Sequence, residues 1–372
     1  MKTRKTPKIN SLYIHVPFCE HLCDYCDFPK LQYFRIFAEK YIAALKNELD
    51  SYQIKDSLKT IYIGGGTPTA LEDDLFEQLL KIIKPYSDGV IEYTVETNPE
   101  SLSENKLALM KRYGVNRLSI GVQSTNDKIL SIINRHHTFE DVKTAISSAR
   151  KMGFDNLNVD LIIGLPHVNE SFFIVDLAHI LTLNVEHISL YSLTVHPHTV
   201  FFTKGIKEPD DELTRKLYDD AEEVLKNNGY VHYEVSNWAR PGKESKHNFT
   251  YWKNEHYYGV GLGAAGFIGN IRYKNTRSLD QYLKGNYVEE KEIVSKEDDR
   301  TYTIMLNLRT NQGIDLQEFK EKFDEDLLET KKEEIKSFIE QKLLYMDERS
   351  HRLIATYDGM MVLDQIITEL ID

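Results

Sequence analysis

All three cysteines of the chain lie within eight residues, as Cys19, Cys23 and Cys26 in the stretch FCEHLCDYCDF. This Cys-x3-Cys-x2-Cys spacing allows three thiolates to converge on one metal centre. One interpretation is a zinc site in which His15 or His21 supplies the fourth ligand. The other is a [4Fe–4S] cluster, which normally takes four thiolates, so that here one iron is left to bind another molecule. Structural zinc sites usually pair cysteines across two knuckles, and the chain has no second knuckle, which favours the cluster.

Three consecutive glycines, Gly64, Gly65 and Gly66, follow an apolar segment in IYIGGGTPT. Without Cβ atoms, backbone can approach a ligand closely and adopt positive φ angles. The stretch lacks both the Lys-Ser/Thr ending and the G-x-G-x-x-G spacing of common phosphate loops. A flexible turn is the alternative, although a turn needs only one or two glycines. We therefore expect this loop to line a ligand site.

The elements that must position these loops alternate along the first part of the chain. Amphipathic segments such as 37–49 and 69–83 separate short apolar runs, and Thr69 and Glu72 are spaced as a helix capping box. This alternation predicts an α/β fold with parallel strands. Six units are too few for a closed eight-fold barrel, so we expect an open, partial six-unit β/α barrel with its site at the carboxyl ends of the strands. The predicted strands are 12–16, 60–63, 92–96, 117–122, 156–163 and 187–193.

Composition limits the class of protein. The 372 residues are 41% hydrophobic and carry a formal charge of −12, which argues against nucleic acid as a partner. The basic start MKTRKTPK is not followed by the apolar stretch of a signal peptide, and no apolar run approaches the roughly 20 residues of a membrane span. Three clustered cysteines suit a reducing compartment, so we expect a cytoplasmic protein.

The pattern changes after residue 210. We expect a basic N-terminal tip at 1–10, the barrel at 11–210 and an extension at 211–290 that begins with a helix and continues into an aromatic-rich stretch. Residues 291–372 read as helices followed by a strand, a turn and a last helix. They predict a small, mainly helical, winged-helix-like C-terminal domain.

The cysteine motif after the first strand and GGGTP after the second together resemble the radical S-adenosylmethionine (SAM) superfamily. The resemblance implies a [4Fe–4S] cluster on Cys19, Cys23 and Cys26, whose open iron is chelated by the amino and carboxylate groups of SAM. Tyr25 matches the aromatic position that packs near the adenine. The glycine stretch would meet the methionyl amino group.

Polar residues at later strand ends indicate a branch of this superfamily. Glu96, Gln123, Arg135 and Asp160 could each be an ordinary loop residue or helix cap. In this order, however, they resemble the branch that contains anaerobic coproporphyrinogen III oxidase (HemN) and the haem chaperones of the HemW family. Arg135 would pair with the SAM carboxylate, and Gln123 and Asp160 would suit ribose hydroxyls. The SAM site implied by the resemblance comprises Tyr13, Tyr25, Gly65, Gly66, Thr67, Glu96, Gln123, Arg135 and Asp160.

Three features resemble the haem chaperones more than the oxidase. The oxidase has a further cysteine where this chain has Phe28, and it has an N-terminal extension, whereas this chain reaches its first strand by Leu12. The stretch KHNFTYW at 246–252 resembles the HemW signature and implies haem binding with an imidazole as ligand. The alternative is a core histidine packed among aromatics. The haem candidates are His247, Asn248, Tyr251 and Trp252.

The leading hypothesis is a haem chaperone that binds a [4Fe–4S] cluster, SAM and haem and delivers haem to acceptor proteins such as respiratory enzymes. The alternative is an oxygen-independent coproporphyrinogen III oxidase, which decarboxylates porphyrinogen propionates by radical chemistry. No residue is assigned a catalytic role. A homodimer and transient association with a membrane surface both remain open.

Overall fold

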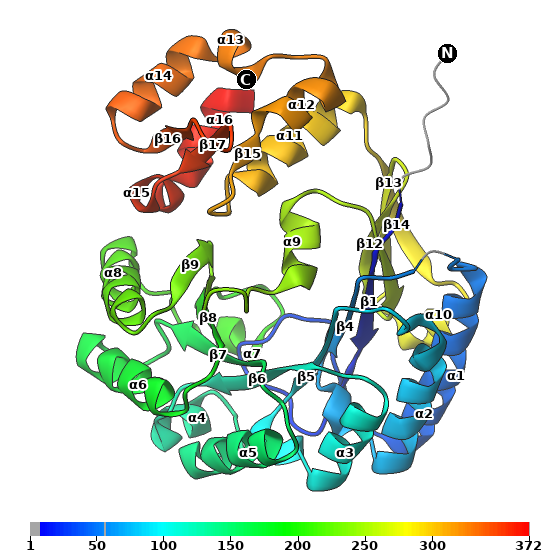
Figure 1. Cartoon of the computed structure of the whole chain (residues 1–372). Helices are drawn as coiled ribbons and strands as arrows, with labels where there is room; N and C mark the ends of the chain where they lie inside the picture. The colour runs from blue at the N-terminus through cyan, green and yellow to red at the C-terminus, as the bar shows by residue number, and fades with distance from the viewer. Residues whose placement is uncertain (1–7, 56, 372) are drawn as a thin grey trace.

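A twelve-stranded sheet forms the centre of the computed structural model, which describes residues 8–55 and 57–371 (Figure 1). The strand order is β14-β13-β12-β11-β1-β4-β5-β6-β7-β8-β10-β9. The six predicted strands are confirmed as β1 (Ser11–Val16), β4 (Thr60–Gly65), β5 (Glu92–Thr97), β6 (Arg117–Gln123), β7 (Leu157–Ile163) and β8 (His187–Ser192). They pair in parallel, as βα units require. Most of the predicted basic tip, residues 1–7, lies outside the described residues.

Helices cover the outer face of this curved sheet (Figure 1). They are α1 (Arg35–Ser51), α2 (Asp73–Ile83), α3 (Glu104–Arg112), α4 (Asp127–Ile132), α5 (Phe139–Lys151), α6 (Glu170–Thr182) and α8 (Asp211–Asn227). The predicted capping box at the start of α2 is wrong. Glu72 is itself the N-cap residue, and the Thr69 hydroxyl instead bonds the hydroxyls of Thr97 and Ser101, at 2.9 and 2.6 Å. A short 3₁₀ turn at Pro68–Ala70 separates Thr69 from the helix.

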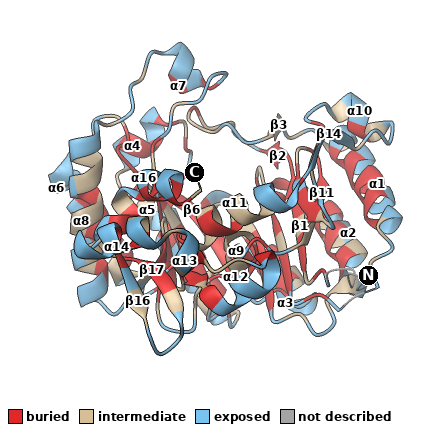
Figure 2. Ribbon diagram, turned by 90° about the horizontal axis from the view of Figure 1, so that it is seen from above, coloured by how far each residue is buried: buried red, intermediate tan, exposed pale blue. Residues whose placement is uncertain are grey.

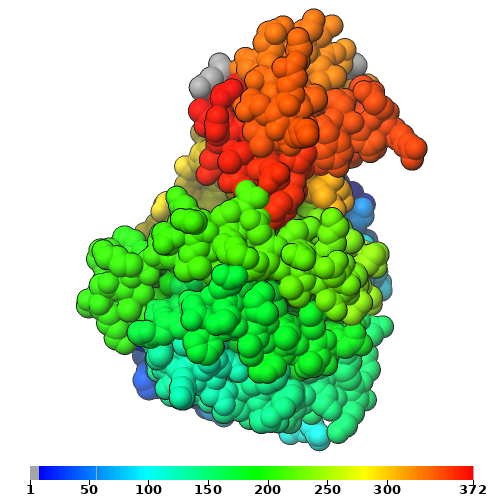
Figure 3. All heavy atoms as spheres, turned by 90° about the vertical axis from the view of Figure 1, so that its left-hand side faces the viewer, coloured from blue at the N-terminus to red at the C-terminus, as the bar shows by residue number. Residues whose placement is uncertain are grey.

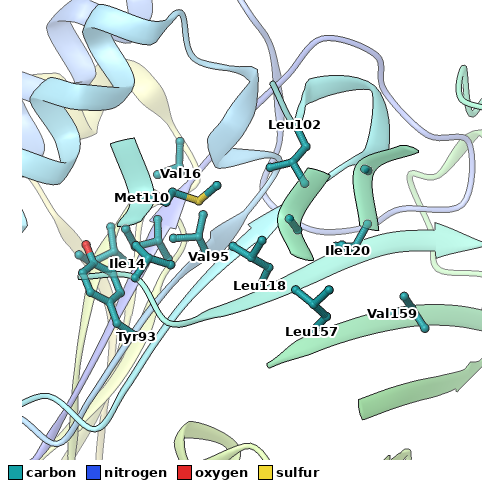
Figure 4. Packing of buried hydrophobic residues seen from close by; sticks show 14 of the residues in the cluster. Ile14, Val16, Tyr93, Val95, Leu102, Met110, Leu118, Ile120, Leu157 and Val159 are labelled. Carbon is teal, nitrogen blue, oxygen red and sulfur yellow. The ribbon is translucent and has the colours of Figure 1, made fainter. Parts of the chain in front are cut away.

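Each strand sends alternate side chains to opposite faces. The outward residues are apolar and pack beneath the helices, where Val95, Leu118, Leu157 and Val159 belong to the same cluster of buried side chains as Met110 of α3 (Figure 4). The inward residues of the same strands are mostly polar. The interior of the barrel is therefore polar, and the hydrophobic core lies between the sheet and its helices.

The extension at 211–290 adds strands to both edges of the same sheet. On one edge, β10 (Asn237–Ala239) pairs antiparallel with β8, and β9 (Val231–Glu234) pairs with β10. On the other edge, β11 (Tyr257–Gly261) pairs in parallel with β1. Beyond it lie β12 (Ala265–Ile268), β13 (Ile271–Asn275) and β14 (Val288–Ile293), with helix α10 (Leu279–Leu283) before β14.

The C-terminal residues form a lobe above the barrel, shown in orange and red in Figure 3. A three-stranded sheet of β15 (Ile314–Asp315), β17 (Arg352–Ala355) and β16 (Leu344–Asp347) packs with helices around its own apolar core. This arrangement agrees with the winged-helix-like domain expected from the sequence. The helices are α11 (Lys296–Asn307), α12 (Leu316–Phe323), α13 (Leu327–Thr330), α14 (Lys332–Glu340), α15 (Tyr357–Met361) and α16 (Leu363–Ile371).

Figure 2 shows the sheet strands as largely buried and the outer helices as exposed on one side only. Such one-sided burial is typical of helices packed on a sheet. Within residues 8–55 and 57–371, no helix combines the length and the apolar character needed to cross a membrane.

Candidate functional site

A cavity of about 380 Å³ opens at the carboxyl ends of the parallel strands. The loop that carries the cysteines folds over this end of the barrel through the short parallel pair β2 (Phe18–Cys19) and β3 (Leu31–Gln32). The loop is tied to its neighbours by the Asn134 side chain, which donates to the Leu22 carbonyl at 2.8 Å, and by Lys204, whose Nζ lies 2.6 Å from an Asp24 carboxylate oxygen. All three cysteines line the cavity.

The glycine stretch makes the close approach of these loops possible. The Gly65 φ angle is +121°, a conformation that L side chains rarely adopt. A Cβ on Gly66 would lie 2.8 Å from the Cys19 sulfur, and one on Gly64 would lie 2.8 Å from the Glu96 carboxylate. The Gly66 and Thr67 amides donate to carbonyls of the cysteine segment, those of Val16 and Phe18, at 2.8 Å each. These glycines therefore bring the second strand end against the cysteines.

The cysteines fit a cluster better than a single ion. All three are free thiols, and burial raises the pKa of Cys19 to about 12, because the charged thiolate is poorly solvated there. Among the described residues, no group of three His, Cys, Asp or Glu side chains converges closely enough to hold one metal ion. In a cubane each thiolate binds its own iron, so the cysteines need only line one cavity. The donor set of three soft thiolates suits iron–sulfur ligation.

Arg135 lies beside the cysteine loop with its guanidinium buried. It donates to the Asn98 side chain at 2.9 Å and to the Gly121 carbonyl, and its Nη1 lies 3.6 Å from the Cys23 sulfur. Its Nε has no hydrogen-bond partner among the residues that the structure describes. A buried donor without a partner is costly, so this edge of the guanidinium is suited to an acceptor on a ligand.

Two carboxyl groups face the cavity from β5 and β7, the two strands that flank β6. Glu96 accepts from the Gly65 amide at 2.9 Å and from the Tyr62 hydroxyl at 2.7 Å, and burial raises its pKa to about 7. Burial also raises the pKa of Asp160, which accepts from the Asn158 side chain at 2.8 Å. Glu96 is therefore poised to change charge near neutral pH.

The structure brings most predicted SAM residues into this cavity. They are Tyr25, Gly65, Gly66, Thr67, Glu96, Gln123, Arg135 and Asp160. Tyr13 does not line it; its hydroxyl is hydrogen-bonded to Nδ1 of His15, two residues along β1, at 2.9 Å. Of the haem candidates only Asn248 lines the cavity. Trp252 faces a smaller cavity, of about 130 Å³, beside the C-terminal domain.

His247 lies at the opposite end of the barrel from the cysteines. It belongs to α9 (Lys246–Trp252), which covers the amino ends of the strands. Its Nδ1 bonds the hydroxyl of Thr60, the first residue of β4, at 2.8 Å, and its Nε2 bonds the Tyr251 hydroxyl at 2.8 Å. Because β4 has six residues, its two ends are about 17 Å apart. The imidazole is buried, with both nitrogens occupied, as the alternative of a core histidine describes.

The polar interior of the barrel was not predicted from the sequence. Arg117, Asn158, His187 and Ser189 line the deep part of the cavity. They alternate with buried apolar residues along β6, β7 and β8, and that alternation was the available signal. Arg117 is nearly fully buried and its Nε has no hydrogen-bond partner.

Comparison with known proteins agrees with this geometry. Residues 13–177 match the radical SAM superfamily, and residues 294–362 match the HemN C-terminal domain. The chain is 40% identical to the haem chaperone HemW of Lactococcus lactis over 351 residues, which cover 92% of each chain. It is 37% identical to the haem chaperone HemW of Bacillus subtilis, with 96% of this chain and 98% of that protein covered.

A solved structure shares the whole fold. Coproporphyrinogen III oxidase (HemN) from Escherichia coli superposes with a TM-score of 0.86 at 23% identity, covering 99% of this chain and 91% of that one. This likeness shows the fold alone, whereas the sequence identity to the two haem chaperones extends along nearly their whole length. The chain belongs to the HemW family within the radical SAM superfamily.

Proposed function

We propose that this chain is a haem chaperone that holds a [4Fe–4S] cluster on Cys19, Cys23 and Cys26, binds SAM in the cavity and delivers haem to acceptor proteins. The observation that carries the proposal is its 40% identity to a haem chaperone over 92% of both chains. The three cysteines at one cavity, beside a buried guanidinium, support the cofactors.

The residues around the cavity suit SAM in chemical terms. When bound, the cluster would supply an open iron for SAM to chelate and an electron for SAM. Gly65 and Gly66 leave backbone open at the cysteines, and the free Nε edge of Arg135 suits a carboxylate. Glu96, when it is ionised, suits the N–H donors of the methionyl amino group, and Gln123 and Asp160 suit ribose hydroxyls.

The test is an anaerobic haem titration of the reconstituted protein, with and without SAM. We expect stoichiometric haem binding, followed by transfer to an apo-acceptor such as a haem-free respiratory enzyme. The same preparation should show no useful conversion of coproporphyrinogen III. Rapid conversion, or failure of the wild-type protein to bind haem, would contradict the proposal.

The oxidase remains the alternative function, but no feature of the site favours it. The likeness to the Escherichia coli oxidase, at 23% identity, concerns the fold. At the position of the further oxidase cysteine, Phe28 offers no thiol.

Delivery also implies a route to the acceptors. We expect transient association with a membrane surface where respiratory acceptors reside. The exposed side chains of Phe34, Ile36 and Phe37 at the start of α1 support this part of the proposal. Co-sedimentation with anionic vesicles measures the association, and sedimentation velocity of the reconstituted protein distinguishes monomer from homodimer.

A further inference from the structure

A haem-binding imidazole must offer a nitrogen that the protein leaves free. Three of the thirteen histidines line the large cavity, namely His21, His187 and His196. His187 is buried, and its two nitrogens bond the Asn158 side chain at 2.6 Å and the Tyr233 hydroxyl at 2.7 Å. His21 and His196 are exposed at the mouth of the cavity.

His196 offers an exposed imidazole at the mouth of the cavity. It lies in the loop after β8 with 46% of its side chain exposed, and its Nε2 is 3.7 Å from an Asp27 carboxylate oxygen. This separation is longer than a hydrogen bond, so the carboxylate leaves the nitrogen available. Within the described chain, no hydrogen bond engages its Nδ1. The His21 ring instead stacks on His136, with centroids 3.8 Å apart.

Exposed apolar side chains lie in the two segments next to His196, the end of the cysteine loop and α7. Phe28, next to Asp27 in the chain, lines the cavity and is 63% exposed. Val200 and Phe202 of α7 (Val200–Thr203) are 44% and 56% exposed. The α7 segment is held to the cysteine loop by the Phe201 amide, which donates to the Asp24 carbonyl at 3.0 Å. In Figure 2, α7 and the β2–β3 pair lie along the same edge of the molecule.

Two cationic side chains also lie near the mouth of the cavity. Lys30 lines the cavity, and the guanidinium of the exposed Arg277 donates to the Asp27 carbonyl at 2.5 Å. Haem presents a flat apolar ring and two propionate carboxylates. An exposed aromatic next to two cations, in a chain with a net charge of −12, is complementary to both parts of this molecule.

Building on the proposed function, we propose that haem binds at this mouth, with His196 as its iron ligand and Phe28 against the macrocycle. Lys30 and Arg277 are placed for the propionates. The haem site is thus at the carboxyl ends of the strands, on the same side as the cysteines, whereas His247 lies at the amino ends. The HNxxYW helix contributes to the fold of the barrel and not to iron ligation.

The test uses the full chain with its cluster reconstituted and haem as the probe. His196→Ala should weaken haem binding by at least about tenfold and alter the Soret and EPR signature of the bound iron. The matched control is His198→Ala, which removes an exposed histidine two residues away that does not line the cavity. Iron content and SAM binding are measured in every variant and should not change.

A second pair of variants tests the ring contact independently. Phe28→Asp should weaken haem binding, whereas Phe28→Leu should largely preserve it. Unchanged affinity and spectra in His196→Ala would overturn the inference, as would loss of iron ligation in His21→Ala alone. If the wild-type protein binds haem and His196→Ala binds it equally well, this site alone is refuted. If the wild-type protein binds no haem, the proposed function is refuted.

Discussion

Replacing His247 by alanine should destabilise the protein while leaving haem ligation intact. The imidazole is fully buried and bridges β4 to α9 through Thr60 and Tyr251. Its removal leaves the half-buried Tyr251 hydroxyl without this partner, leaves the Thr60 hydroxyl with Ser11 alone, and opens a cavity beneath the helix. Unpaired buried polar groups cost about 1–3 kcal/mol and large-to-small core changes cost about 2–5 kcal/mol, so we expect a loss of about 3–5 kcal/mol.

The pH dependence of this loss identifies its cause. Burial, and then the charge of Arg117, lowers the pKa of His247 to about 3 from the ordinary value of 6.5. Below pH 6.5 the His247 imidazole is protonated in the unfolded chain but stays neutral in the native protein. The stabilisation from His247 is therefore complete above pH 6.5 and falls as the pH approaches 3. At pH 5 about 2 kcal/mol should be lost, at about 1.4 kcal/mol per pH unit.

The assay is urea denaturation of wild type and His247→Ala at about pH 7.5 and pH 5, with His198→Ala as the exposed control. The difference in unfolding free energy should be smaller at pH 5 by about 2 kcal/mol. Comparing variants cancels the opposite trend of the buried carboxyls, such as Glu96, whose raised pKa stabilises the native state as the pH falls. A variant of wild-type stability that has lost the haem-iron spectrum would refute the reasoning.

The other predictions concern the cavity. Gly66→Ala should reduce the iron content on reconstitution, because its Cβ would lie 2.8 Å from the Cys19 sulfur. Gly89→Ala is the control for backbone strain alone: its φ is +75° and its Cβ meets nothing within 4 Å, so this variant should lose stability but take up iron normally. Cys19→Ser should abolish the absorption of the cluster near 400 nm, measured anaerobically, and a normal spectrum would remove the basis for the cluster assignment. SAM affinity, measured by equilibrium dialysis, should fall as the pH drops below about 7, where Glu96 gains a proton. The Glu96→Gln variant should bind SAM weakly and with little dependence on pH. If SAM binding by this variant still depends on pH, another group is responsible.

Strand positions and the cysteine site were predictable because they depend on local patterns. Apolar runs before Gly or polar loops located β1 and β4 to β8, and their parallel pairing placed the loops after them at one end. Side chains alternate between the two faces of each strand, and the residues on the inward face would have indicated Arg117 and His187 as well. Strands with one polar and one apolar face are unusual in a parallel sheet, and here they reflect a lumen that holds ligands.

The place of α9 could not be read from its sequence. The residues of KHNFTYW suit iron and a flat ring, but their position depends on the long-range pairing of β11 with β1, which starts at Tyr257 opposite Ser11. That register carries the preceding helix to the amino ends of the strands. Glu92, the first residue of β5, accepts from the His247 amide at 2.9 Å and holds the helix there. The imidazole of a chemically suitable motif thus lies at the opposite end of the strands from the cysteines.

The α9 helix also determines how molecules enter and leave. Asn248 of this helix and the cysteine loop both line the cavity, which opens at the carboxyl ends of the strands. Two ligands that share one opening must exchange in order. Haem seated at the mouth would slow the escape of SAM from behind it, and SAM bound first would be retained for as long as haem stays. Haem bound at the mouth would therefore determine the order in which haem and SAM leave the protein.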